Sequence, residues 1–132
     1  MKYLIDTNIC VHILRGKYEL NKKIKSKGYN NCVISEITYA ELIYGAECSD
    51  NIQKNHEKIN YFFTGFKIFS IKEIIQEFAI QKARLKRKGM PISDFDLLIG
   101  STAIFHDLIM VTENTKHFKR IKGIQLEDWT KL

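Results

Sequence analysis

The 132-residue sequence predicts an α/β protein in which helices cover both faces of a mainly parallel sheet. Short runs of β-branched and aromatic residues alternate along the chain with stretches of helical periodicity. Strands separated by helices pair in parallel through right-handed crossovers. The composition, 45% hydrophobic and 11% aromatic, is that of a globular chain. One domain, residues 1–132, is therefore expected, and at this length its core needs no metal or disulfide links.

Each predicted element rests on its local pattern. Strands are expected where short apolar runs meet polar or turn-forming residues, at Tyr3–Ile5, Cys32–Ile34, Lys67–Phe69 and Leu108–Val111, with a weaker fifth at Ile124–Leu126. Helices are expected at Ile9–Leu14, Leu20–Ser26, Glu36–Cys48, Gln53–Phe63, Lys72–Lys88, Asp94–Phe105 and Lys116–Arg120. The seven glycines and the single proline are scattered between these segments, which indicates turns and no linker.

The first predicted strand ends on an acid. In "KYLIDTN" the apolar run stops directly before Asp6, Thr7 and Asn8. Thr7 or Asn8 can cap the helix that follows, but a cap leaves Asp6 unexplained. Functional sites of parallel sheets form at the carboxyl ends of the strands. Asp6 thus occupies the position expected of a functional residue.

Composition limits the classes of function. Lys and Arg number 21 against 15 Asp and Glu, a net charge of +6. This balance suits a polyanionic partner such as nucleic acid, although a lysine-rich proteome explains it equally well. Cys10, Cys32 and Cys48 are odd in number and lack C-x-x-C spacing, as expected of buried, reduced thiols in a cytoplasmic protein. The apolar runs are too short for a membrane span or a signal peptide.

A second candidate acid lies in "ISEITYAELIYGAE". Ser35 is the expected N-cap of this helix. Glu41 falls within an apolar stripe formed, at helical spacing, by Ile37, Ala40, Tyr44 and Cys48. A buried carboxylate is costly without a cation. Glu41 is therefore either a functional group, the partner of a Lys or Arg, or a side chain that reaches water from the rim of the stripe.

Two further acids open the apolar helix in "GMPISDFDLLIGSTA". Ser93 or Asp94 is the expected N-cap, and Asp94 and Asp96 point in different directions on a helix. Asp96, three residues after Ser93, can also complete a capping box. One cap does not need both acids, so at least one is a candidate for the same end of the sheet as Asp6.

A fourth polar cluster follows the strand in "LIMVTENTKHF" and comprises Thr112, Glu113, Asn114 and Thr115. A turn and a helix cap would explain it, but convergence of all four clusters at one end of the sheet is the better account. Carboxylate, amide and hydroxyl oxygens suit Mg²⁺ or Mn²⁺. Such an ion activates water against a phosphodiester, and the basic surface would hold the polyanion. The four histidines show no ligand spacing, and no glycine-rich phosphate loop occurs.

Taken in order, "YLIDTN", "ISEITYAELIYG", "GMPISDFDLLIGSTA" and "VTENTKHFKRIKGIQLEDW" resemble PIN-domain ribonucleases, and more narrowly the VapC toxins of bacterial toxin–antitoxin pairs. The resemblance spans Tyr3 to Trp129. It implies a compact three-layer α/β/α sandwich around a mainly parallel sheet of four or five strands. It also implies a Mg²⁺- or Mn²⁺-dependent endoribonuclease, a hydrolase of phosphodiester bonds.

The resemblance also implies roles for individual residues. Asp6, Glu41 and Asp96 match the family's catalytic acids and metal ligands, Glu41 directly or through water. Asp94 takes a variable position, as a cap or a supporting group, and Thr7 and Asn8 orient Asp6 or its waters. The family's fourth acidic position falls on Asn114, after Thr112. This departure removes a charge and weakens the case for a tightly held second metal, unless Glu113 substitutes.

Partners follow from the same resemblance. A cognate VapB-type antitoxin would wrap the toxin and block its acidic pocket, and the toxin would form a homodimer. The substrate would be a structured RNA, a tRNA or rRNA loop, whose cleavage inhibits translation. The cations of "KARLKRK" would contact its phosphates or simply complement the dipole at a helix end. They are Lys82, Arg84, Lys86, Arg87 and Lys88.

Two alternatives stay open. The first is a PIN-type nuclease of RNA processing outside toxin–antitoxin systems, against which the short chain counts. The second is a non-catalytic RNA-binding module, against which the complete set of Asp6, Glu41 and Asp96 argues.

Overall fold

The computed structural model describes residues 2–131, which form five parallel strands in one sheet. The strands are β1 (Tyr3–Ile5), β2 (Cys32–Ser35), β3 (Lys67–Phe69), β4 (Ile109–Val111) and β5 (Gln125–Glu127). Their order across the sheet is β3-β2-β1-β4-β5, and every neighbouring pair is parallel. The prediction of a parallel sheet with a fifth strand is confirmed. All strands therefore end at the same edge, with β1 in the centre.

The helices alternate with the strands, as predicted. They are α1 (Thr7–Leu14), α2 (Leu20–Lys27), α3 (Glu36–Glu47), α4 (Ile52–Phe63), α5 (Ile75–Arg87), α6 (Asp94–Phe105) and α7 (Thr115–Phe118). Predicted ends differ from these by one or two residues at most elements. The largest difference is at α5, because Lys72–Ile74 forms a separate 3-10 turn in place of its first turn.

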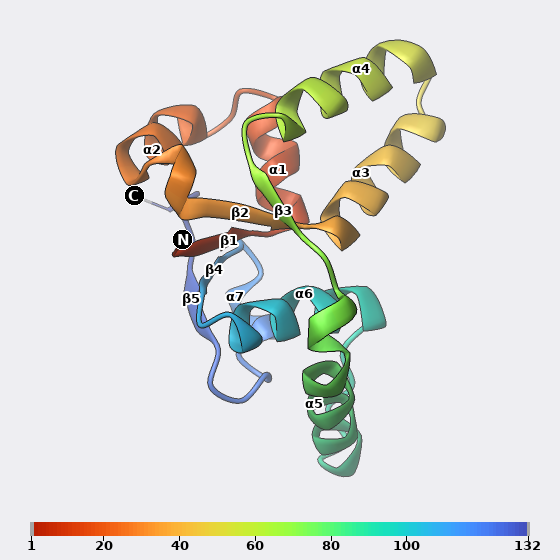
Figure 1. Cartoon of the computed structure of the whole chain (residues 1–132), viewed down its shortest axis with the longest axis vertical. Coiled ribbons are helices and arrows are strands. Elements are labelled where there is room, and N and C mark those ends of the chain that lie inside the picture. Colours follow the sequence, from red (N-terminus) through yellow and green to blue (C-terminus); the bar gives the residue numbers. More distant parts are fainter. Residues whose placement is uncertain (1, 132) are drawn as a thin grey trace.

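The alternation of side chains along β1 explains the layers. Tyr3 and Ile5 point into a core shared with α1 to α4, whereas Leu4 points into a second core shared with α5 to α7. Figure 1 shows the two helical layers above and below the sheet. Because both faces are covered, the central strands are buried throughout. The three-layer α/β/α sandwich is confirmed.

The position of α6 depends on a close approach at Gly100. A Cβ atom built there would collide with the Cδ1 atom of Ile121. Glycine thus lets the segment after α7 pack directly on α6. This contact matters because α6 carries Asp96 and the α7 region carries Asn114 and His117.

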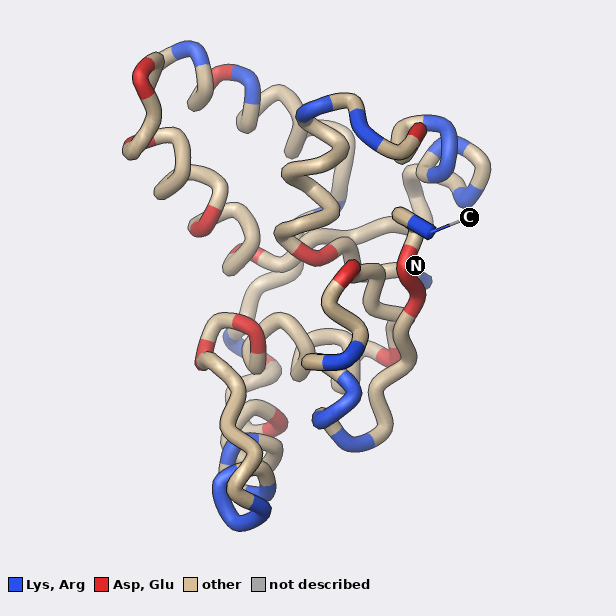
Figure 2. The backbone as a smooth tube through the Cα atoms, turned by 180° about the vertical axis from the view of Figure 1, so that it is seen from behind, with Lys and Arg blue, Asp and Glu red and all other residues tan. Residues whose placement is uncertain are grey.

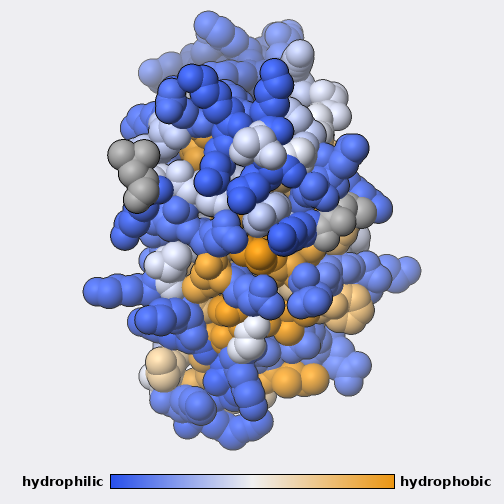
Figure 3. Space-filling view, turned by 90° about the vertical axis from the view of Figure 1, so that its left-hand side faces the viewer, coloured by the Kyte–Doolittle hydropathy of each residue, from blue (hydrophilic) through white to orange (hydrophobic). Residues whose placement is uncertain are grey.

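The surface carries a cluster of basic residues and a face rich in hydrophobic residues. Figure 2 shows basic residues gathered at the far end of α5, at the bottom of the view. Figure 3 shows one face on which hydrophobic residues gather below a hydrophilic upper half. Exposed apolar side chains in the molecule include Ile75, Ile80 and Phe105. No helix within residues 2–131 is both long and apolar enough to cross a membrane.

One prediction about the cysteines is wrong. Cys10 and Cys32 are buried free thiols, but Cys48 is exposed. It follows the last residue of α3, where the helix runs out beyond the core.

Candidate active site and metal centre

Asp6 stands where β1 gives way to α1 and is 4% exposed. It is the N-cap of α1, and its Oδ1 atom accepts a hydrogen bond from the Thr7 backbone N–H at 2.8 Å. Its Oδ2 atom accepts one from the Thr112 hydroxyl at 2.8 Å, across from the end of β4. The prediction that Thr7 or Asn8 caps this helix is therefore wrong. Both carboxylate oxygens of Asp6 are fixed in place.

The environment of Asp6 disfavours its charge. Burial raises its pKa from the ordinary 3.8 to about 6, although the hydrogen bonds from Thr112 and Thr7 act in the opposite direction. The negative charges of Asp96 and Glu41 raise this pKa further. Asp96 and Glu41 are thus each close enough to Asp6 to repel its charge. A cation placed among them would relieve that repulsion.

Glu41 is tied to the start of α1 by Thr7. The Thr7 hydroxyl donates to the Oε1 atom of Glu41 at 2.7 Å. The hydroxyl oxygens of Thr7 and Thr38 lie 3.0 Å apart, and since Thr7 gives its one proton to Glu41, Thr38 is the donor. Thr7 therefore holds both acids, Asp6 through its backbone N–H and Glu41 through its hydroxyl.

The predicted apolar stripe of α3 is not its buried face. Ala40, Tyr44 and Cys48 are exposed, and the buried residues of α3 are Ile37, Thr38, Leu42 and Ala46. Ala40 and Tyr44 of this stripe instead border a groove of about 800 Å³ between α1, α3 and α4, to which Thr7, Glu41 and Phe95 also contribute. Glu41 is half-buried at the edge of this groove.

The two acids of α6 separate, as their spacing indicates. Ser93 is the N-cap and accepts a hydrogen bond from the Asp96 backbone N–H at 3.3 Å. Asp94 pairs with Lys82 of α5 at 2.8 Å, so it supports the packing of α5 on α6. The Asp96 side chain is 34% exposed, and its Oδ2 atom lies 3.2 Å from the Nε2 atom of His117. Of the two acids, Asp96 is the one whose charge raises the pKa of Asp6.

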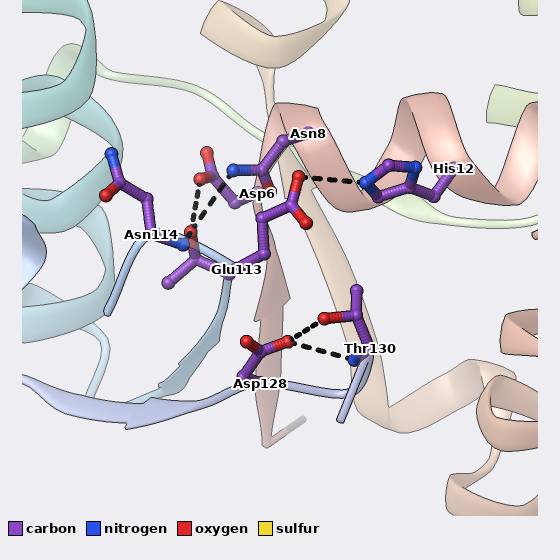
Figure 4. A network of polar contacts seen from close by, with 8 residues as sticks. Asp6, Asn8, His12, Glu113, Asn114, Asp128 and Thr130 are labelled. Atoms are coloured by element: carbon purple, nitrogen blue, oxygen red, sulfur yellow. Dashed lines mark hydrogen bonds and ion pairs between the residues drawn. The ribbon is translucent and has the colours of Figure 1, made fainter. Parts of the chain in front are cut away.

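The loop after β4 closes the site from the other side (Figure 4). The buried Thr112 hydroxyl oxygen accepts a hydrogen bond from the Asn114 backbone N–H at 3.0 Å, and the Asn8 amide lies 3.5 Å from it. Glu113 turns to α1, where its Oε1 atom lies 2.8 Å from the Nε2 atom of His12. Thr112 thus links Asp6 to this loop, while His12 engages Glu113.

The donor set fits a hard divalent cation. Asp6, Glu41 and Asp96 offer carboxylate oxygens, and the buried Oδ1 atom of Asn8 has no hydrogen-bond partner among the described residues. Within residues 2–131 no three His, Cys, Asp or Glu side chains stand close enough to enclose a metal ion. Mg²⁺ keeps several of its waters and needs only one or two carboxylates, so this spacing is compatible with it.

The basic run at the end of α5 has mixed roles. Lys82 is paired with Asp94, and Arg84 donates to the Gln81 side chain and to the Arg120 carbonyl, at 2.6 Å for the latter. Lys86, Arg87 and Lys88 are exposed. The sequence grouped all five together, but within residues 2–131 only the side chains of these last three form neither an ion pair nor a hydrogen bond.

Sequence reasoning missed His117. The four histidines were set aside because they lack ligand spacing along the chain, yet α7 brings His117 against Asp96. The two residues are 21 positions apart and on different elements, so no local pattern connects them. A histidine within three residues of Asn114 was the one available signal.

These features have a counterpart in known proteins. The family described as PIN domain matches residues 3–124. The chain belongs to this family. The match includes Asp6, Glu41, Asp96 and Asn114 within a single stretch.

Relatives of this PIN domain are similar along nearly their whole length. It is 33% identical over 131 residues to the tRNA(fMet)-specific endonuclease VapC of Shigella flexneri, with 98% of this chain and 99% of the relative covered. It is 38% identical over 136 residues to ribonuclease VapC2 of Rickettsia felis, with 99% and 100% covered.

Solved structures agree with these relatives. The structure of DNA-bound VapBC from Salmonella typhimurium has a chain that superposes with a TM-score of 0.91 at 30% identity, covering 98% of both chains. VapBC2 from Rickettsia felis, bound to a DNA fragment from its promoter, gives a TM-score of 0.86 at 34% identity, covering 98% of this chain and 99% of that one.

Proposed function

We propose that this protein is a divalent-metal-dependent endoribonuclease and the toxin of a type II toxin–antitoxin pair. The observation that carries the proposal is Asp6, a buried acid with both oxygens held by Thr7 and Thr112 and with Glu41 and Asp96 near enough to raise its pKa. The similarity to VapC ribonucleases over nearly the whole chain supports the same activity.

The roles of the acids follow from how each is held. Asp6 is rigid and buried, which suits a ligand that must not move during the reaction. Asp96 is more exposed and can meet both the cation and the RNA phosphate. Glu41 has one oxygen held by Thr7, which leaves its Oε2 atom to accept a proton from water. When bound, the cation lowers the pKa of water and stabilises the charge that develops on the phosphodiester.

We propose a structured RNA as substrate, with tRNA as the first class to test, because a full-length relative is named a tRNA(fMet)-specific endonuclease. The net charge of +6 supplies attraction to phosphates that does not depend on sequence. Lys86, Arg87 and Lys88 are the free cations of the basic run and the proposed phosphate contacts.

The proposed partner is a VapB-type antitoxin, because the similar structures are VapBC complexes. The groove between α1, α3 and α4 offers it an apolar surface beside Glu41 and Thr7. An antitoxin segment lying there would cover the acids. A homodimer is also proposed, and exposed apolar side chains such as Phe105 and Ile75 support it.

Cleavage of a total tRNA pool by the purified chain tests the activity. We expect cleavage that stops in EDTA and returns with Mg²⁺ or Mn²⁺, and that is absent in Asp6→Asn. Asp50→Asn is the matched control, since Asp50 is an exposed acid in the turn between α3 and α4. Cleavage that continues in excess chelator would contradict the metal mechanism, and inert wild-type protein with added metal would contradict the nuclease assignment.

A further inference from the structure

His117 faces the candidate metal centre without forming a hydrogen bond. Its Nε2 atom is buried and lies 3.2 Å from the Oδ2 atom of Asp96, yet no hydrogen-bond geometry is met between them. The ring packs edge-on against Phe118, with the ring centroids 5.3 Å apart, and Phe118 is anchored in the core. The imidazole is therefore held beside Asp96 by packing.

The 3.2 Å between His117 Nε2 and Asp96 Oδ2 is close to the distance between two neighbouring ligands of one metal ion. Ligand atoms bound to one cation at about 2.0–2.2 Å, in neighbouring octahedral positions, lie about 3 Å apart. Each then directs a lone pair at the cation, and the two atoms do not point at each other. The 3.2 Å separation of Nε2 and Oδ2 without hydrogen-bond geometry is compatible with two such ligands.

The other histidines near acids do not meet the same conditions. The Nε2 atom of His12 is hydrogen-bonded to Glu113 at 2.8 Å, and that of His56 to Glu47 at 2.6 Å. The Nε2 atom of His106 is likewise buried without a hydrogen-bond partner and lies 3.4 Å from Glu73, but Glu73 is not one of the candidate acids and its side chain is 62% exposed. His106 also follows Asp96 by ten residues on α6, about 15 Å along the helix and away from the acids. Of the four histidines, all within the described residues, only His117 forms such a contact with one of the three candidate acids.

We propose that the Nε2 atom of His117 is a ligand of the divalent metal, adjacent to Asp96. This inference rests on the metal site of the proposed function and adds a nitrogen to its oxygen ligands. Mg²⁺ strongly prefers oxygen, whereas first-row transition metals accept imidazole readily. The centre therefore selects a transition-metal ion such as Mn²⁺ over Mg²⁺.

The direct test is pulsed electron paramagnetic resonance of Mn²⁺ added to the metal-free full chain. A coordinated imidazole gives a ¹⁴N coupling that oxygen ligands do not give. We expect this coupling in the wild type, its loss in His117→Gln, and its retention in His12→Gln and His106→Gln. Titration calorimetry of the same proteins should show at least about a tenfold loss of Mn²⁺ affinity in His117→Gln alone, and a smaller loss for Mg²⁺.

A variant with an acid in place of His117 provides a second test of the proposed ligand. His117→Glu replaces the imidazole with an anionic oxygen ligand, so we expect it to bind metal without the ¹⁴N coupling and with its preference moved towards Mg²⁺. Bound Mn²⁺ with no ¹⁴N coupling in the wild type, or a coupling that persists in His117→Gln, would overturn the role of His117 and leave the carboxylate site intact. A wild-type chain that binds neither ion would overturn the metal site as a whole.

Discussion

The raised pKa of Asp6 makes the stability of the metal-free protein depend on pH. The folded state binds this proton with a pKa of about 6 and the unfolded state with the ordinary 3.8. Between these values the folded state holds more protons, so the free energy of unfolding falls as pH rises. The contribution is complete below pH 3.8 and lost above about pH 6.

The size of the effect follows from the same two values. At about 1.36 kcal/mol per pH unit, the difference between 3.8 and about 6 corresponds to about 3 kcal/mol over the whole window. Between pH 4.5 and 7 the loss is about 2 kcal/mol. With an unfolding entropy of about 2.1 cal/mol/K per residue over 132 residues, 2 kcal/mol lowers the melting temperature by about 7 °C.

The assay compares wild type with Asp6→Asn, which cannot titrate at this position. Urea unfolding in EDTA from pH 4.5 to 7.5 gives the free energy of unfolding of both, and their difference removes the contribution of the other acids and histidines. We expect the wild type to lose about 2 kcal/mol relative to the variant as pH rises. With saturating metal the trend should reverse, because the ion binds the deprotonated acid. Parallel curves in EDTA would refute the argument.

Other consequences of the site can be checked independently. Asp96→Asn should nearly abolish cleavage with little loss of metal-free stability, because clustered carboxylates repel, whereas Asp94→Asn should keep most activity and lose at most about 1 kcal/mol from the exposed pair with Lys82. Cleavage rates and thermal melting of the two variants decide this, and the reverse ranking would make Asp94 the ligand. Expression of the chain alone should arrest growth and co-expression of a neighbouring antitoxin gene should restore it, as followed by culture density; harmless folded protein would point to the non-toxin alternative. Reversing the charges of Lys86, Arg87 and Lys88 should weaken RNA binding and reduce its salt dependence, measured by titration at several salt concentrations, by about 0.7 in the logarithmic slope per lost phosphate contact. An equal effect from reversing three cations of α2 would show that only net charge matters, and those control residues are Lys22, Lys23 and Lys25.

Local patterns were enough for the elements of the fold. Apolar runs such as Leu4 and Ile5 form strands because alternate side chains can be buried on both faces of a sheet. The start of α6 was predictable because Ser93, an N-cap residue, stands before a long apolar stretch. The 3-10 turn before α5 was not predictable, because the pattern of apolar residues continues through it.

The candidate site divides in the same way. Asp6 stood out because it follows a buried strand, at the end of a parallel sheet where functional sites form. Glu41 and Asp96 were open candidates from their patterns, and the resemblance to PIN-domain ribonucleases singled them out. The hydrogen-bond partners of these acids could not be predicted from the sequence, because they are distant from the acids along the chain. Thr112 reaches Asp6 across 106 positions, and Thr7 reaches Glu41 across 34.

The sequence by itself determined the alternation of strands and helices, the end of the sheet where the acids gather, and the three candidate carboxylates. The first two properties depend on the polarity and spacing of neighbouring residues, whereas the choice of the three carboxylates came from the resemblance to PIN-domain ribonucleases. Only the tertiary structure decided that Asp94 pairs with Lys82, that Glu113 turns to His12, and that His117 stands against Asp96. Each of these pairs joins two elements whose relative position is set by core packing. The chain contains several Lys, Arg and His residues that could pair with each acid, so the sequence alone does not identify the partner.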